Sequence, residues 1–251
     1  MSLFRTIVFT AAVAGIIAGL VLTATQYVST VPLIQKAETF ETAAAPAAPA
    51  STAAPARPEA RQGHAHPHAA TAAPDHHGGG WMPADGFERF AYTLLANIVG
   101  GIGIALIMVS LSEIRGGLHG WREGVLWGLA GFAAFTLAPS IGMPPDPPGM
   151  PAADLFARQA WWIATVVLTA GGIALLVLQR SLIGAVVGLA LIIGPHIVGA
   201  PRPEHFETAV PPALTHDFVV AVIISSLVFW VVLGAFAGFF RARLGRAAAT
   251  P

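Results

Sequence analysis

Histidine is the residue type in this 251-residue chain with the clearest potential for chemistry. The chain has no cysteine, which excludes disulfides, thiolate metal sites and iron–sulfur clusters. Neutral imidazole binds Co, Ni, Cu and Zn well, whereas Mg and Ca prefer oxygen ligands. Histidines alternate with other residues in one short segment that contains His64, His66, His68, His76 and His77. In a flexible chain they would fix no geometry, so the pattern indicates fast capture and release of a transition metal. The alternative is a low-complexity tract without a role.

A second candidate is the Gly194-Pro195-His196 sequence near the end of an apolar stretch. Proline removes a helix hydrogen bond and frees a carbonyl. Membrane transporters place ion sites at broken helices, and an ionisable residue within a span is a functional candidate. We therefore expect His196 to be a metal ligand within the membrane; the alternative is a residue that caps the helix end at the interface.

Ionisable residues in the neighbouring connections are candidates for an ion entrance. The proline-rich segment 139–151 should hold a fixed shape above the bundle, and Trp161 and Trp162 after it are typical of an interfacial aromatic anchor. The predicted metal-binding residues of this entrance are Asp146, Asp154, Glu204, His205 and His216. The weaker candidates for the inner half of a path are Asn97, Ser110, Ser112 and Glu113.

Composition predicts the elements that must position these residues. Hydrophobic residues make up 55% of the chain and charged residues only 10%, too few to cover a soluble domain but enough for the ends of a membrane bundle. Mean hydropathy is +0.69. We predict an all-α polytopic membrane bundle with six spans at residues 7–28, 90–111, 121–138, 161–178, 182–198 and 218–240.

Two of these spans are open to a second interpretation. The stretch 182–198 is interrupted by Gly194 and Pro195, so the number of spans is five or six. The first stretch, with Arg5 before it, is alternatively a signal peptide. Residues 179–181 leave room only for a tight hairpin between the fourth and fifth spans. Closely packed helices are predicted by the small-residue pairs Gly15/Gly19, Gly124/Gly128, Gly184/Gly188 and Gly234/Gly238.

The chain accordingly divides into four parts. Residues 1–28 are the first transmembrane helix, and 90–240 are a five-helix membrane core. Between them, residues 29–89 form an extracytoplasmic loop rich in Ala, Pro and His, which we predict to be largely disordered because it buries too little apolar surface. Residues 241–251 are a cytoplasmic tail.

Arginine distribution predicts the sidedness. With the N-terminus in the cytoplasm, six spans return the C-terminus to the same side. The short segments on that side hold Arg5, Arg115, Arg122, Arg180, Arg241, Arg243 and Arg246, as the positive-inside rule requires. Every acidic residue except Glu113 and Glu123 then faces outward, and an acidic face rich in imidazole concentrates divalent cations. Net charge is formally zero, which offers no basic surface for nucleic acid.

Two sequence blocks resemble the CbtA family of cobalt transporter membrane subunits. The first contains LAP at 137–139, GMPPDPPG at 142–149, ADL at 153–155, RQ at 158–159 and WW at 161–162. The second contains PHIVGAPRP at 195–203 and continues with VP at 210–211, Leu214 and Phe218. The family is usually described with five spans, against six counted above. The resemblance implies Co²⁺ uptake for cobalamin synthesis, in the cell (inner) membrane, with a small single-span, His-bearing CbtB-type subunit as partner.

The preferred functional hypothesis is therefore a permease subunit rather than an enzyme, with no permanently bound cofactor and with Co²⁺ as the transported ion. Imidazole and carboxylate ligands accept Ni²⁺ and Zn²⁺ as well, so the ligands alone do not select cobalt. A non-transporting metal sensor or scaffold is the alternative. A haem-bearing oxidoreductase is a third hypothesis, which the single histidine within a span argues against. A homo-oligomer in the lipid bilayer is left open.

Overall fold

A computed structural model describes residues 2–44, 83–179 and 181–249, and all regular structure in these residues is helical. Five helical segments are long and apolar enough to cross a membrane. The sixth apolar helix has only 17 residues. The elements are α1 (Leu3–Ala44), α2 (Phe87–Glu113), α3 (Trp121–Phe132), η1 (Ala133–Leu137), α4 (Ala138–Gly142), α5 (Leu155–Leu178), α6 (Leu182–Val198) and α7 (Pro212–Ala249). The prediction of a polytopic helical membrane protein is confirmed.

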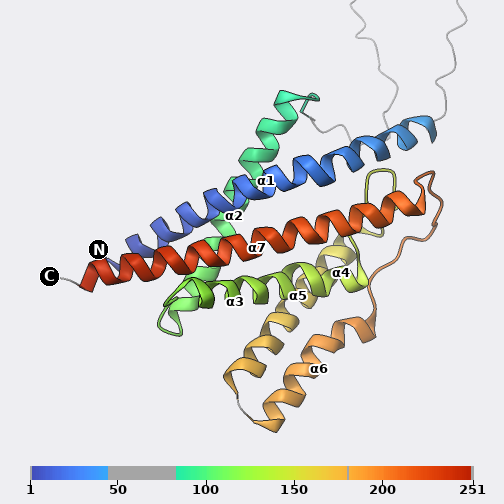
Figure 1. Ribbon diagram of the computed structural model, residues 1–251. Coiled ribbons are helices and arrows are strands. Elements are labelled where there is room, and N and C mark those ends of the chain that lie inside the picture. The colour runs from blue at the N-terminus through green and yellow to red at the C-terminus, as the bar shows by residue number, and fades with distance from the viewer. Residues whose placement is uncertain (1, 45–82, 180, 250–251) are drawn as a thin grey trace, which may run out of the picture.

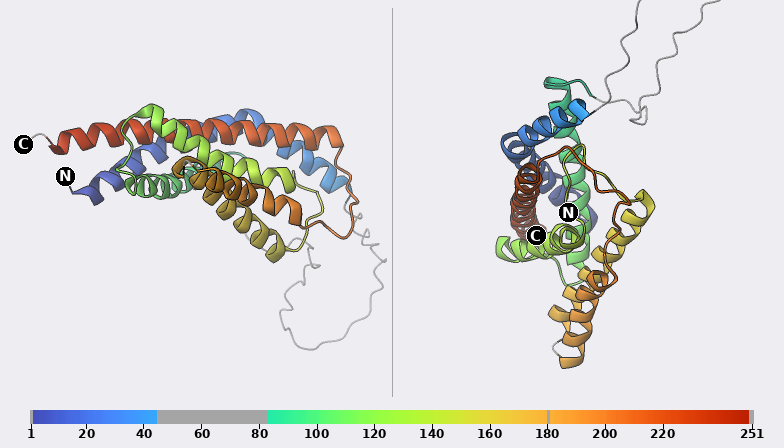
Figure 2. Two further views of the ribbon diagram at one scale, coloured as in Figure 1. Left: turned by 90° about the horizontal axis from the view of Figure 1, so that it is seen from below. Right: turned by 90° about the vertical axis from the view of Figure 1, so that its right-hand side faces the viewer.

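Helices α1 and α7 lie side by side along the length of the molecule, and the two ends of the chain lie at the same end of it (Figure 1, Figure 2). Helix α2 crosses α1, and α3 packs on α7. The α5–α6 hairpin extends away from this group, as the right-hand view of Figure 2 shows. Against the six predicted spans, the described residues thus contain five long apolar segments and the shorter helix α6.

Helix α6 is not interrupted at Gly194-Pro195, contrary to the pattern expected from these residues. It runs unbroken to Val198, although Pro195 in its last turn has no N–H to donate to the carbonyl of Leu191. Gly199 then ends the helix with a φ of +86°, which glycine adopts without strain. The predicted tight hairpin between α5 and α6 is present: α5 ends at Leu178 and Ser181 caps the start of α6.

Helix α1 continues to Ala44, well beyond the end predicted at residue 28. Residues 29–44 are therefore helical, although they belong to the loop predicted to be largely disordered. The cause is a second apolar cluster, in which Ala37 of this extension is buried against Val210 and Leu214. At about 1.5 Å per residue, a helix of 42 residues is about 63 Å long, so α1 extends far beyond a hydrocarbon core of about 30 Å.

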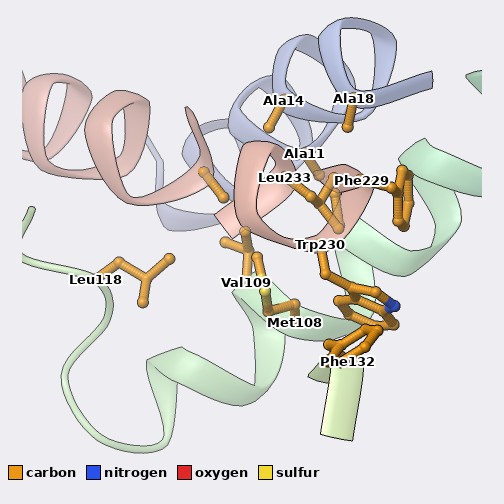
Figure 3. Packing of buried hydrophobic residues seen from close by; sticks show 12 residues of the cluster. Ala11, Ala14, Ala18, Met108, Val109, Leu118, Phe132, Phe229, Trp230 and Leu233 are labelled. Atoms are coloured by element: carbon orange, nitrogen blue, oxygen red, sulfur yellow. The ribbon is translucent and has the colours of Figure 1, made fainter. Parts of the chain in front are cut away.

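Small residues bring the helix backbones into direct contact, as the small-residue pairs predicted. A Cβ atom on Gly15 would lie 2.4 Å from the backbone nitrogen of Ile102, and one on Gly124 would lie 2.0 Å from the carbonyl oxygen of Gly234. The principal core cluster forms around these contacts where α1, α2, α3 and α7 meet, with Trp230 and Leu233 of α7 at its centre (Figure 3).

A π-helical turn, η1, connects α3 to α4 in one continuous helical segment from Trp121 to Gly142. Pro139 has no N–H to donate to the carbonyl of Phe135. The residue before it, Ala138, donates its backbone N–H to the carbonyl of Ala133, five residues earlier, which is the hydrogen-bond pattern of a π-helix. Trp230 of α7 donates its indole N–H to the hydroxyl of Thr136 at 3.3 Å, which ties this turn to the core. After this turn, α4 ends at Gly142, which lies against Trp161 of α5 and Ala200 after the end of α6.

Candidate functional site

The connections that contain the two sequence blocks meet at the end of the bundle opposite the chain termini (Figure 1). The connection before α5 contributes the carbonyl of Gly149, which accepts a hydrogen bond from the hydroxyl of Thr208 at 3.0 Å. The same hydroxyl oxygen accepts from the backbone N–H of Val210 at 3.1 Å. Gly149 has a φ of +82°, and a Cβ there would lie 3.2 Å from Val210. The proline-rich connection therefore has a fixed position against the α6–α7 connection.

Trp161 connects the two sequence blocks directly. It is only 8% exposed, and its indole N–H donates to the carbonyl of Pro195 at 3.2 Å. Gly142 leaves space for the indole, since a Cβ there would lie 2.6 Å from a ring atom of Trp161. Trp161 was predicted to be part of an interfacial aromatic anchor, but its side chain is buried where α5 packs against α4 and α6. Trp162 packs edge-on against Phe135, with ring centroids 6.1 Å apart.

His196 lies in the last turn of α6 and is half-buried. Its ring stands edge-to-face with that of Trp161, at a centroid distance of 6.1 Å and an interplanar angle of 69°. The Nδ1 atom is enclosed, and it has no hydrogen-bond partner among the residues that the structure describes. An imidazole nitrogen without a partner in a protein interior is uncommon and needs an explanation.

The two aspartates predicted at the entrance have different surroundings. Asp146 is exposed in the proline-rich connection, yet partial burial of its carboxylate raises its pKa above the ordinary aspartate value, and the positive charge of Arg158 partly opposes that rise. Asp154 is the N-cap of α5, and its carboxylate accepts from the backbone N–H of Ala157 at 2.8 Å. This cap gives Asp154 a structural role. The cap uses only one carboxylate oxygen, Oδ1, so the role does not prevent metal binding by the other oxygen.

The other predicted entrance residues are exposed. Glu204 and His205 lie in the connection between α6 and α7, and His216 is in the first turns of α7. The Nδ1 atom of His216 is 3.7 Å from a carboxylate oxygen of Asp217. Within residues 2–44, 83–179 and 181–249, no three His, Asp or Glu side chains are close enough to hold one metal ion together. His64, His66, His68, His76 and His77 lie outside the described residues.

Three of the four candidates for the inner half of a path are engaged in contacts within the protein, whereas Ser110 is exposed. Asn97 donates from its amide nitrogen to Thr23 at 3.0 Å and to Gln26 at 2.8 Å. Ser112 donates to the carbonyl of Val109 at 2.6 Å. Glu113 forms a two-pronged ion pair with Arg241, in which Nη2 and Oε2 are 2.8 Å apart and each side chain is 15% exposed. Asn97 therefore joins α2 to α1 and Glu113 joins α2 to α7, whereas the bond of Ser112 lies within α2.

The arrangement thus offers one half-buried imidazole beneath an exposed face that carries carboxylates and further histidines. A single imidazole holds a divalent ion weakly, which suits transient passage better than storage. The indole–carbonyl bond of Trp161 was not predicted from the sequence, although both of its residues belong to the quoted blocks. The sequence shows a tryptophan in one block and a proline in the other, but their spacing along the chain does not predict that the two residues form a hydrogen bond.

Comparison with known proteins gives one match. The family model described as "Probable cobalt transporter subunit (CbtA)" matches residues 4–242, which is nearly the whole chain and includes both sequence blocks. Neither the curated proteins nor the solved structures contain a match to this chain.

Proposed function

The chain belongs to the CbtA family of probable cobalt transporter subunits, and from this premise we propose that it is the membrane permease subunit through which Co²⁺ enters the cell for cobalamin synthesis. The observation that carries the proposal is the convergence of both sequence blocks on His196, a half-buried imidazole at the end of a short apolar helix. An imidazole nitrogen, a ligand of borderline softness, suits a late first-row divalent metal in that place. The apolar helices provide the membrane setting.

The proposed path begins at the exposed end of the bundle. The histidines between α1 and α2 capture the ion and deliver it to the face that carries Asp146, Glu204 and His205. His196 then binds it within the membrane. Conduction requires binding that is strong enough to admit the ion and weak enough to release it, and one imidazole meets that condition. Ni²⁺ and Zn²⁺ bind the same ligands, so the competition of these ions with Co²⁺ measures the selectivity.

We place the protein in the inner membrane with both termini in the cytoplasm. The common location of the two chain ends and the arginines at that end support this orientation. A reporter that is active only outside the cytoplasm, fused after the C-terminus, should remain inactive. Strong activity of that fusion would contradict the orientation and favour an odd number of spans.

A partner is part of the proposal, because the family is described as a subunit. We propose a small single-span, His-bearing CbtB-type protein. Cells that express this chain with the partner should accumulate radioactive cobalt above the level of cells with an empty vector. Cells with the chain alone show whether the partner is needed. If neither chain nor pair raises accumulation while the purified chain binds Co²⁺, the protein is the metal sensor or scaffold of the alternative hypothesis.

The five histidines between α1 and α2 should assist at scarce metal without being the pore. Replacing His64, His66, His68, His76 and His77 with alanine should raise the Co²⁺ concentration needed for half-maximal uptake by several-fold and leave the maximal rate nearly unchanged. A tethered chelator raises local concentration rather than providing a path. Initial uptake rates over a range of Co²⁺ concentrations measure both parameters. A lower maximal rate at saturating Co²⁺ would show that these histidines are on the path itself.

A further inference from the structure

Trp161 takes no part in the transport steps above, yet its side chain occupies the place where both sequence blocks meet. We propose that Trp161 is a positioning residue that holds the last turn of α6 and thereby directs the His196 imidazole toward the ion. The inference rests on the proposed function, because it assigns His196 to Co²⁺ binding. It adds a residue that binds no metal itself.

The indole ties the end of α6 to α5. The carbonyl of Pro195 accepts two hydrogen bonds, one from the backbone N–H of Gly199 at 3.0 Å and one from the indole of Trp161 at 3.2 Å. Proline has no N–H, so this turn lacks one of the hydrogen bonds that normally hold a helix end. The hydrogen bond from Trp161 restrains this turn from outside the helix, and it acts on Pro195, the residue directly before His196.

The surroundings of His196 leave only one imidazole nitrogen available. The ring of Trp161 stands against the ring of His196, and Nδ1 of His196 is enclosed without a hydrogen-bond partner among the described residues. An enclosed nitrogen cannot reach an ion, so Nε2 is the nitrogen left for Co²⁺. Metal-ligating histidines depend on such surrounding groups for their orientation, and loss of one of these groups commonly weakens metal binding.

Gly142 fixes the indole from the opposite side. A Cβ at this position would lie 2.6 Å from Cη2 and 2.7 Å from Cζ2 of Trp161, and 3.2 Å from the Cβ of Ala200. Even a methyl group at Gly142 must therefore displace the indole. Substitution of Gly142 is therefore a second way to displace the Trp161 side chain, and it does not remove the indole N–H group.

The first experiment compares Trp161→Phe with Trp162→Phe, which makes the same change in the neighbouring side chain. Phenylalanine keeps an aromatic ring and removes the N–H. In Trp161→Phe we expect a roughly ten-fold rise in the Co²⁺ concentration for half-maximal uptake, in the range that loss of an orienting partner causes at metal sites. Trp162→Phe should transport like the parent. The double variant Trp161→Phe/His196→Gln should transport no less than His196→Gln alone, because a residue that acts only through His196 adds nothing once the imidazole is absent.

A second measurement follows His196 directly. Diethylpyrocarbonate modifies accessible imidazole, and mass spectrometry of peptides quantifies the modification at His196, with the exposed His119 as internal reference. Co²⁺ should protect His196 in the parent chain, and Trp161→Phe should need a roughly ten-fold higher Co²⁺ concentration for the same protection. A residue that only stabilises the fold would change the amount of protein in the membrane and leave this concentration unaltered.

The outcomes separate the two proposals. If Co²⁺ does not protect His196 in the parent chain, the assignment of His196 in the proposed function is wrong. If the parent is protected but Trp161→Phe behaves like Trp162→Phe in both measurements, the positioning role of Trp161 is overturned. Should Trp161→Phe fail to reach the membrane, Gly142→Ala decides the question: a raised half-saturating concentration supports the role, and parental values refute it.

Discussion

Replacing His196 with glutamine should lower the maximal rate of Co²⁺ uptake by roughly ten-fold or more, because loss of a ligand costs at least as much as loss of the groups that orient it. Glutamine has a similar size and stays polar, so it tolerates the half-buried position near Trp161. Its amide, however, is a much poorer ligand for Co²⁺ than imidazole. The effect should persist at saturating Co²⁺, because the imidazole is absent, whereas a misdirected imidazole in Trp161→Phe can still be filled at a higher Co²⁺ concentration.

The matched control is His119→Gln, the same substitution at the other end of the bundle. His119 is exposed and contacts Glu123 at 3.1 Å, and it has no place in the proposed path. Membrane levels measured by immunoblotting should be equal for both variants and the parent. If His196→Gln transports like His119→Gln, then His196 is an interfacial residue and the ion crosses elsewhere.

Hydropathy and residue spacing predicted most of the fold because a membrane imposes local rules. A long apolar stretch must form a helix, and a three-residue connection such as 179–181 permits only a hairpin. The continuation of α1 to Ala44 could not be predicted in this way. It depends on tertiary contacts of Ala37 with Val210 and Leu214, which come from a connection and helix far along the chain. Local composition does not contain that information.

In the candidate site, too, local features could be predicted from the sequence and tertiary contacts could not. His196 and its proline were identified from the sequence because an ionisable residue within an apolar stretch is conspicuous. The burial of Trp161 was missed, since a tryptophan pair at the end of a span is equally typical of a membrane interface. Its bond to Pro195 connects residues in different helices, and only the hairpin geometry brings them together. Binding of metal by the histidines between α1 and α2 stays a prediction.

The packing of α3 on α7 should fail when Gly124 is replaced by leucine. A Cβ at Gly124 would lie 2.0 Å from the carbonyl oxygen of Gly234 and 2.9 Å from the Cα of Gly238, so the larger residue meets backbone that no side-chain rotation can move away. The helices must separate, and the cluster around Trp230 and Leu233 opens with them. Forcing extra atoms into a packed core typically costs about 1–3 kcal/mol, and rigid backbone on both sides places this change at or above the upper end of that range.

Gly103→Leu separates this effect from the general consequences of replacing glycine in a membrane helix. Gly103 is an exposed position of α2, and a Cβ there would have no neighbour within 4 Å. Leucine is the better helix former, so this control should unfold no earlier than the parent. Titration of the purified proteins with a denaturing detergent, followed by helical circular dichroism, measures the midpoint of unfolding. Gly124→Leu should unfold at a clearly lower detergent fraction, or fail to accumulate. Equal midpoints for both variants would mean that α3 and α7 do not touch through their glycines, and the packing described here would be wrong.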